Sequence, residues 1–340
     1  MRIHKFESTE AFIAIDLADA EASSGPVRWA KKVLQGGAKD LARSQTYTYA
    51  ALGMRRGGAS AGISADPDAR GAAIEAFTGE LGALVAAGTY LPDAAKGVGT
   101  DDLAVVRGDD PRDSARLDAV AARFDSLSAA VTAEATVGLA GRTVAIEGFG
   151  DAGPDLAGAV AARGGTIIAV STSTGTVTSD AGIDADALTE AYAAEGPDCV
   201  NRFGEVGHPM AVFGSGAGVT FAGSKTGVVD HTVAGQLTDS AALIASGRLA
   251  MTARALAVLR AADVAAPGDF VSLAGGTIAA WGDPARSDEQ VASDIATTVA
   301  DLCNEHKDHA DGPFLAACYA AESFLSTWQD TLPFGRPLAP

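Results

Sequence analysis

The segment Thr143–Gly153, TVAIEGFGDAG, decides the fold class of this chain. It is a short apolar, β-branched run that ends in the pattern G-x-G-x-x-G, formed by Gly148, Gly150 and Gly153. The next residues, PDLAGAVAARGG, predict a helix with Pro154 in its first turn, and GTIIAVSTS predicts a second buried strand. Strand, glycine turn, helix and strand within about thirty residues predict a βαβ unit of a parallel, doubly wound sheet.

Each glycine of this turn has its own physical role. Gly148 allows the tight turn, Gly150 lets a pyrophosphate approach the backbone, and Gly153 lets helix and strand pack closely. The helix N-terminus adds partial positive charge at the same place. The pattern therefore predicts a dinucleotide-binding loop, and a turn kept only for structural reasons is the alternative. The loop consists of Gly148, Phe149, Gly150, Asp151, Ala152 and Gly153.

The residue after the second strand usually distinguishes NAD from NADP. An acid there binds the 2′-hydroxyl of the adenosine ribose and repels a 2′-phosphate. Counting from Gly148 places Thr172 at this position, within the segment STSTGT, which contains neither an acid nor an arginine. The hydroxyls of Ser171, Thr172, Ser173 and Thr174 can bond either a ribose or a phosphate. We therefore expect NAD or NADP, without a choice between them.

Length and composition set limits on the class of protein. With 340 residues, 47% of them hydrophobic and 20% charged, the chain is long enough for two globular domains. Its net charge of −18 argues against nucleic acid or an anionic membrane as a partner. No apolar run approaches the roughly twenty residues that span a bilayer. The N-terminal MRIHKFESTE lacks an apolar signal region, so we expect a cytoplasmic protein.

The cysteines and histidines do not suggest a metal site. Cys199, Cys303 and Cys318 are widely spaced and form no CxxC pair, which predicts buried thiols in a reducing compartment. His306 and His309 have a helical i,i+3 spacing, but their charged neighbours favour a solvated face over a metal ligand pair. We therefore expect no metal.

The periodicity of the N-terminal part alternates between strand and helix. It predicts a strand over Phe12–Leu17 and a helix over Val33–Tyr49, which leads into a glycine-rich turn over Gly57–Ile63. Two further helices are predicted over Asp68–Ala87 and Ser114–Ala135, the second as a link between the two halves.

The C-terminal part carries further strand candidates and ends in helices. Strands are predicted over Ala211–Gly214, Gly218–Gly223 and Asp269–Gly275, and two helices over Ser287–Trp328. The final LPFGRPLAP is a proline-rich tail.

Several ordered segments, from about residue 25 to 281, resemble the glutamate/leucine/phenylalanine/valine dehydrogenase family. TYTYAALGMRRGGASAGISADP is similar to the family's TYKxAxAGLPxGGxKGGI–DP, and GLAGRTVAIEGFGDAG to GKTVAIQGFGNVG. PDAAKGVGTDDLAVV resembles the segment of the catalytic aspartate. GVTFAGSKTGVV, IASGRLAMTARA and DFVSLAGGTIAAW match three later segments in order.

The resemblance implies a two-domain α/β fold and an oligomer. It implies a substrate and oligomerisation domain over 1–135, with helices of 287–340 packing back on it, and a Rossmann-type domain with a doubly wound parallel sheet over 136–286. A cleft between the domains would close over NAD or NADP and a small-molecule substrate, and the chain would form a homo-oligomer. Ser224 and Gly247 join Thr172 and the glycine loop as implied cofactor contacts.

The residues on which the family's oxidative deamination depends are replaced. The lysine that holds the substrate carboxylate aligns with Thr48, and the catalytic lysine aligns with Ser60. The slot of the catalytic aspartate falls at 95–97, where no acid stands, and Asp93 lies earlier. Deamination needs an ammonium-facing carboxylate and a lysine of lowered pKa, so we do not expect the ordinary reaction. Two turn asparagines of the family are replaced by Leu249 and Leu273.

Other polar residues are candidates to replace the lost groups. Arg55 or Arg56 can bind a substrate carboxylate bidentately, with a surface ion pair as the alternative. Lys225 follows a buried strand, where clefts of parallel sheets open, and is a candidate catalytic group, with an exposed loop lysine as the alternative. Lys96, beside the missing aspartate, and Ser60 are further catalytic candidates, and Thr48 remains a candidate substrate contact.

Two histidine motifs have more ordinary interpretations. Asp230 and His231 are adjacent, which favours a capping acid and a solvated histidine over a paired general base. His208 precedes a proline in a glycine-rich loop and is interpreted as a loop histidine, with a general base as the alternative.

The leading hypothesis is an NAD(P)-dependent oxidoreductase with altered chemistry, acting on a small anionic substrate. A non-catalytic dinucleotide-binding or regulatory paralogue is the first alternative. A lyase or isomerase that uses tightly bound NAD as an internal redox cofactor is the second.

Overall fold

The computed structural model describes residues 1–119 and 121–340, and its contacts divide the chain into two compact units. The first unit comprises Met1–Val120, Ala280–Pro284 and Cys318–Pro337. The second unit comprises Ala121–Ala279, Ala285–Ala317 and Leu338–Pro340. The domain boundaries near residues 135 and 286 stay a prediction.

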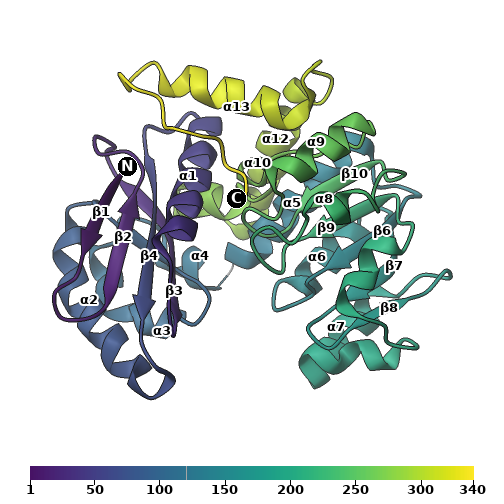
Figure 1. The fold of residues 1–340 in the computed structure, drawn as a ribbon, viewed down its shortest axis with the longest axis horizontal. Helices are drawn as coiled ribbons and strands as arrows, with labels where there is room; N and C mark the ends of the chain where they lie inside the picture. The colour runs from purple at the N-terminus through teal and green to yellow at the C-terminus, as the bar shows by residue number, and fades with distance from the viewer. Residues whose placement is uncertain (120) are drawn as a thin grey trace. The chain divides into compact units, whose positions relative to one another are not determined.

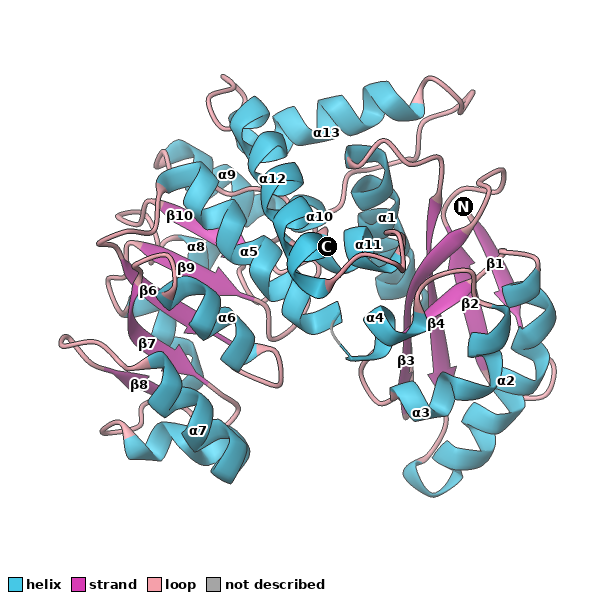
Figure 2. Cartoon of the chain, turned by 180° about the vertical axis from the view of Figure 1, so that it is seen from behind, coloured by secondary structure: helices cyan, strands magenta, loops and turns pink. Residues whose placement is uncertain are grey.

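The first unit is built on a five-stranded mixed sheet (Figure 1). Its spatial order is β1-β2-β4-β3-β5, in which β2 pairs antiparallel with β1 and β4, while β3 pairs parallel with β4 and β5. Helix α1 (Gln35–Ala51) covers one face and α2 (Arg70–Ala86) the other (Figures 1 and 2). The strands are β1 (Arg2–Lys5), β2 (Ala11–Ile15), β3 (Ser23–Ala30), β4 (Gly57–Ser64) and β5 (Leu91–Ala94).

The glycine-rich turn predicted over Gly57–Ile63 is wrong, because this segment is the central strand β4, buried along its whole length. Ala61 and Ile63 pack into the core on the α2 face. On the opposite face, a Cβ at Gly58 would overlap the Ala42 carbonyl oxygen and lie 2.6 Å from the Thr46 amide nitrogen, both in α1. The glycine therefore permits close helix-on-strand packing rather than a turn.

The predicted helices of this region correspond to observed ones. Val33–Tyr49 corresponds to α1, and Asp68–Ala87 to η1 (Pro67–Ala69) and α2. The predicted helix Ser114–Ala135 corresponds to α4 (Ser114–Ala119) and α5 (Ala121–Val137), and its residue 120 lies outside the described residues. The remaining elements are α3 (Thr100–Leu103) and η2 (Ala104–Asp109).

The second unit confirms the Rossmann-type sheet (Figure 2). Its order is β10-β9-β6-β7-β8; the first four strands are parallel and β8 is an antiparallel edge. The strands are β6 (Thr143–Glu147), β7 (Thr166–Ser171), β8 (Thr176–Thr178), β9 (Val219–Ala222) and β10 (Ala242–Ala245). Helices α5, α6 (Gly153–Ala161) and α7 (Ala185–Glu195) share its buried core with β6, β7, β9 and β10.

Two predicted strands in the second unit are wrong. Ala211–Gly214 lies in the 3-10 helix η4 (Pro209–Gly214), where Pro209 stands in the first turn and His208 caps the N-terminus. Asp269–Gly275 begins as the short helix α10 (Asp269–Ser272), all four residues of which are buried. Short buried apolar runs fit either structure, so periodicity alone could not distinguish them.

The remaining elements of the second half are mostly helical. Helix α12 contacts α5 and α10 within the second unit. The elements are η3 (Gly196–Arg202), α8 (His231–Ala234), α9 (Ala253–Ala261), α11 (Gly275–Ala280), α12 (Asp288–His306) and α13 (Gly312–Leu325). In the described part of the chain, no helix is both long and apolar enough to cross a membrane. The prediction of three buried thiols is confirmed, because Cys199, Cys303 and Cys318 are all buried.

Candidate functional site

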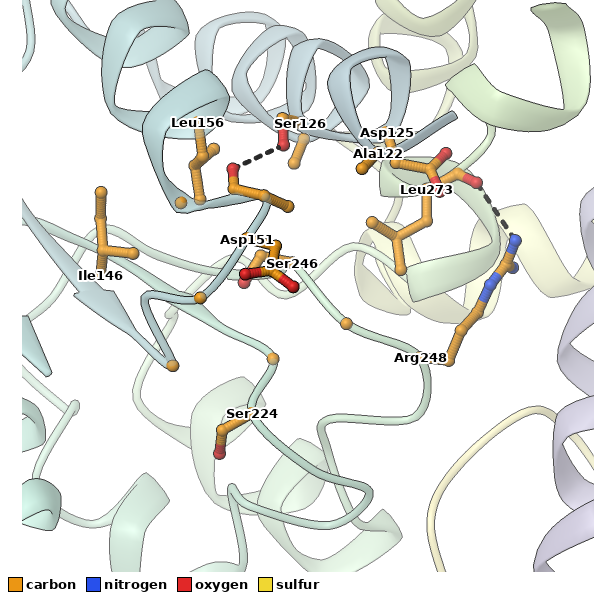
Figure 3. Close-up of a pocket in the computed structure, with 17 residues that line it drawn as sticks. Ala122, Asp125, Ser126, Ile146, Asp151, Leu156, Ser224, Ser246, Arg248 and Leu273 are labelled. Atoms are coloured by element: carbon orange, nitrogen blue, oxygen red, sulfur yellow. Dashed lines mark hydrogen bonds between the residues drawn. The ribbon is translucent and has the colours of Figure 1, made fainter. Parts of the chain in front are cut away.

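A cavity of about 400 Å³ opens at the carboxyl ends of β6, β9 and β10 in the second unit (Figure 3). The chain passes from β6 outward to β7 and β8, then returns to the other side of β6 as β9 and β10, so this edge is a topological switch point. The loops after β6, β9 and β10 line the cavity together with residues of α5. Ligands of open parallel sheets bind at such a crevice.

The glycines of the loop after β6 have different surroundings. Gly148 has φ +77°, and a Cβ there would lie 2.7 Å from the Ser224 amide nitrogen. A Cβ at Gly153 would lie 2.7 Å from the Phe149 ring. Within the described residues, by contrast, a Cβ at Gly150 would have only the Gly148 carbonyl oxygen within 4 Å, at 3.8 Å. Packing inside the protein therefore explains Gly148 and Gly153, but not Gly150.

The loops after β9 and β10 both line the cavity and lie close to each other at Gly223 and Gly247. A Cβ at Gly247 would overlap the Gly223 carbonyl oxygen, so the two backbones approach as closely as glycine allows. The buried Glu147 carboxylate accepts hydrogen bonds from the amides of Gly223 (2.9 Å) and Ser224 (3.1 Å). Sequence reasoning missed Glu147; its signal is an acid at the end of an otherwise apolar strand.

The loop after β10 carries Arg248 and an unusual leucine. The Arg248 side chain lines the cavity and donates to the Leu273 carbonyl oxygen at 3.2 Å (Figure 3). Leu249, which the sequence resemblance aligns with a family asparagine, has φ +54°, a conformation that asparagine adopts more readily than leucine. Its amide donates to Asp269 at 2.9 Å. Leu273, the other leucine that the resemblance aligns with a family asparagine, also lines the cavity.

Two carboxylates and a helix terminus set the electrostatics of the cavity. Asp125 accepts from the Gly276 amide at 2.7 Å, and Asp151 accepts from the Tyr192 hydroxyl at 3.0 Å. Burial and then the bond to Asp151 raise the pKa of Tyr192 to about 12, so Tyr192 keeps its proton at neutral pH. The N-terminus of α6 begins at Gly153 and supplies partial positive charge.

The other predicted cofactor contacts and the candidate catalytic residue Lys225 differ in how exposed they are. Ser224 and Gly247 line the cavity. Thr172 is buried, and its hydroxyl donates to the Pro197 carbonyl oxygen at 2.7 Å. Lys225 is exposed in the loop after β9, next to Ser224.

The acid–histidine pair and His208 lie at helix starts. Asp230 caps α8 by accepting from the amides of Thr232 and Val233, both at 2.9 Å, as the capping interpretation predicts. His208 accepts from the Met210 amide at 3.2 Å. In the described part of the chain, His, Cys, Asp and Glu side chains form no group of three or more that fits a metal ion.

In the first unit, Ser60 and Thr48, which the sequence resemblance aligns with the family's two lysines, are fully buried hydroxyl residues. The Ser60 hydroxyl donates to the Pro26 carbonyl oxygen at 3.0 Å, and the Thr48 hydroxyl donates to the Ser44 carbonyl oxygen at 3.2 Å. At the aspartate slot, Gly97 has φ +79°, and a Cβ there would lie 2.8 Å from the Trp29 carbonyl oxygen. Gly97 itself therefore has no room for a side chain, whereas Lys96 in the same slot is exposed.

An acid stands nearby on the same sheet. Asp93 of β5 pairs in register with Pro26 of β3, the residue whose carbonyl accepts from Ser60. The Asp93 carboxylate, about one third exposed, accepts from Arg112 at 2.6 Å. Arg112 is almost fully buried and also pairs with Asp110 at 2.8 Å. Sequence reasoning missed Arg112, because its partners approach through tertiary packing.

The remaining candidates in the first unit are more exposed. The Arg56 guanidinium stacks 3.7 Å from the Trp281 ring centroid and lines a second cavity with Glu21 and Asp109. Arg55 is exposed, and so is Lys96, on the turn between β5 and α3. The structure thus brings Ser60, Pro26 and Asp93 into one row of the sheet.

The parallel sheet, its glycine loop and the cavity at its switch point define a protein with a Rossmann-type domain. The model of the Glutamate/Leucine/Phenylalanine/Valine dehydrogenase family matches residues 125–311, more than half of the chain, and the chain belongs to this family. Members of the family are oxidoreductases that use NAD or NADP. A search of curated proteins finds no match.

Three solved structures illustrate the likeness of fold. A hetero-hexameric glutamate dehydrogenase from Thermus thermophilus, in a Leu bound form, has 21% identity and a TM-score of 0.77, over 95% of this chain and 86% of that chain. Plasmodium falciparum glutamate dehydrogenase has 14% identity and a TM-score of 0.78, over 94% and 80%. L-tryptophan dehydrogenase from Nostoc punctiforme has 18% identity and a TM-score of 0.66, over 96% and 97%.

Proposed function

We propose that this protein is an NAD(P)-dependent oxidoreductase with altered chemistry that acts on a small anionic substrate. Gly150 carries the cofactor part of this proposal. Its neighbours leave space for a side chain, yet the position holds glycine in the lining of a cavity that the first residue of α6, Gly153, also lines. A pyrophosphate lying against the backbone gives a physical reason for that glycine.

The residues around the cavity fit a dinucleotide. The loop from Gly148 to Gly153 and the N-terminus of α6 would hold the pyrophosphate, with Arg248 as the cation that lines the cavity. Ser224 and Gly247 would contact the half that carries the nicotinamide. When bound, the nicotinamide ring supplies hydride transfer.

On the substrate side, we propose altered chemistry because the sequence resemblance aligns the family's two lysines with Ser60 and Thr48. Ser60 and Thr48 are buried hydroxyls bonded to backbone carbonyls, and neither can act as a cation. Arg56 or Arg55 would bind the substrate's negative charge. Lys225 and Lys96 remain candidates for proton transfer, because both are exposed and lie at the carboxyl ends of strands.

The test is calorimetric titration of the full chain with NAD⁺, NADH, NADP⁺ and NADPH, followed by turnover assays with glutamate, leucine and phenylalanine. We expect binding of at least one dinucleotide and no ordinary amino-acid deamination. Absence of all dinucleotide binding would overturn the proposal. Ordinary turnover of an amino acid would overturn its claim of altered chemistry.

A second candidate function is that of a non-catalytic, regulatory subunit. The lack of room for a side chain at Gly97 and the burial of Ser60 favour it. The Thermus structure is named as hetero-hexameric, so heteromeric assembly occurs in this fold. Light scattering would test our expectation of a homo-oligomer, and oxidoreductase turnover by the isolated chain would exclude a purely regulatory role. Stoichiometric NAD that co-purifies would instead favour a lyase or isomerase.

A further inference from the structure

An acid from outside strand β7, Asp198, is hydrogen-bonded to the turn that follows this strand, next to the glycine loop. This inference rests on the proposed dinucleotide binding and concerns the choice between NAD and NADP. The strand β7 ends at Ser171, whose carbonyl oxygen accepts from the Phe149 amide of the glycine loop at 2.7 Å. The β7–β8 turn therefore lies directly against the loop, where the adenosine ribose of a bound dinucleotide is held.

Thr172, the position of the missing acid, is unsuited to bind the ribose. It is buried, its hydroxyl proton is donated to the Pro197 carbonyl oxygen, and its oxygen accepts from the Thr174 amide at 3.2 Å. The hydroxyl proton and one of its two acceptor lone pairs are therefore used inside the protein, and the burial of Thr172 leaves the second lone pair little access to a ligand.

The element η3 supplies an acid at the same turn. The Thr174 hydroxyl donates to Asp198 Oδ1 at 2.7 Å, and the preceding Pro197 accepts from Thr172. Two hydrogen bonds therefore fix η3 on the β7–β8 turn. Asp198 is exposed, so its carboxylate can accept further bonds from a ligand.

The charges around this turn disfavour an additional phosphate. Residues 171–178, STSTGTVT, contain no lysine or arginine. The arginine of η3, Arg202, pairs with Glu195 at 2.6 Å. A 2′-phosphate at this turn would meet the Asp198 carboxylate with no cation of the turn to offset it, whereas a 2′-hydroxyl would donate to it.

We propose that Asp198, presented from η3 and held by Thr174, replaces the strand-end acid and makes this site select NAD over NADP. The specificity residue lies more than twenty residues further along the chain than the position where the sequence pattern places it.

The experiment compares dissociation constants of the full chain for ADP-ribose and 2′-phospho-ADP-ribose, and for NAD⁺ and NADP⁺, by calorimetry. We expect the unmodified chain to favour the ligands without the phosphate. The substitution Asp198→Asn removes the charge and keeps the shape, and we expect it to reduce that preference at least about tenfold. Thr174→Ala frees the carboxylate and should reduce it less.

The matched control is Asp186→Asn, the same change at an exposed acid in the first turn of α7. A preference for the phosphorylated ligands, or an equal effect of the two aspartate substitutions, would overturn the role of Asp198. Failure of every ligand to bind would overturn the proposed function itself, so the two failures are distinct. Circular dichroism and thermal unfolding verify the fold of each variant, and Asp198→Ser provides a second substitution.

Discussion

The two glycine-rich segments of this chain, Gly57–Ile63 and Gly148–Gly153, look alike in sequence and have different roles. In the first, glycine lets α1 lie directly on the buried strand β4. In the second, Gly150 lines a cavity, and a Cβ there would have only one described heavy atom within 4 Å. A glycine-rich pattern therefore indicates that another group lies close to the backbone. That group can be a helix of the same protein or a bound ligand.

Gly58→Ala should have the largest effect. Its Cβ would overlap a backbone carbonyl of α1, which no rotamer change can relieve, so we expect the unfolding free energy to fall by about 3 kcal/mol or more. Urea unfolding measures this change. Gly79→Ala in α2, where the new Cβ meets no heavy atom within 4 Å among the described residues, is the control and should be neutral or stabilising. A loss below about 1 kcal/mol would contradict our account of β4.

Gly150→Ala should affect binding rather than stability. The new methyl group fits the protein alone but occupies the space of a pyrophosphate, so we expect dinucleotide affinity to fall at least about tenfold with little change in unfolding free energy. Calorimetry and urea unfolding on the same samples separate the two effects. Gly158→Ala, at an open position of α6, should leave affinity unchanged. Equal binding by both variants would remove the principal argument for the cofactor.

At alkaline pH, the unfolding free energy should depend on the ionisation of Tyr192, which is bonded to Asp151 of the glycine loop. Burial and then the bond to Asp151 raise the pKa of Tyr192 to about 12, whereas an unfolded tyrosine titrates near pH 10. Between these values the unfolded chain releases its proton first, so stability must fall as pH rises. Burial also raises the pKa of Tyr49 and Tyr90 in the first unit, which adds to the fall.

The variant Tyr192→Phe isolates the contribution of the second unit. We expect its unfolding free energy to decline less steeply between about pH 9 and pH 11 than that of the unmodified chain. Urea unfolding at both pH values measures the difference. Identical pH slopes would show that Tyr192 titrates alike in the folded and unfolded chain.

Ser60→Ala should have the smallest effect. It removes one buried hydrogen bond, to the Pro26 carbonyl oxygen, so we expect a loss of about 1 kcal/mol in stability and no change in dinucleotide affinity. Urea unfolding and calorimetry check both expectations. If turnover is found and this substitution abolishes it while the fold is retained, Ser60 is a catalytic residue despite its burial.

The sequence alone determined the fold class, the βαβ unit and the glycine loop after β6. These features depend on local patterns: a β-branched run, glycines at fixed offsets and a proline in the first helical turn. The interpretation of 269–275 failed because a short apolar run is compatible with strand and helix when both are buried. The prediction of a turn over Gly57–Ile63 was wrong because glycine is compatible with both a turn and a strand.

Only the tertiary structure decided which distant side chains meet. Asp198 reaches the β7–β8 turn through η3, and Asp93 meets Arg112 and shares a sheet row with Ser60. Sequence patterns encode contacts between residues a few positions apart, because backbone geometry sets those distances. Contacts between separate elements depend instead on strand register and packing, which become defined only when the whole core has formed.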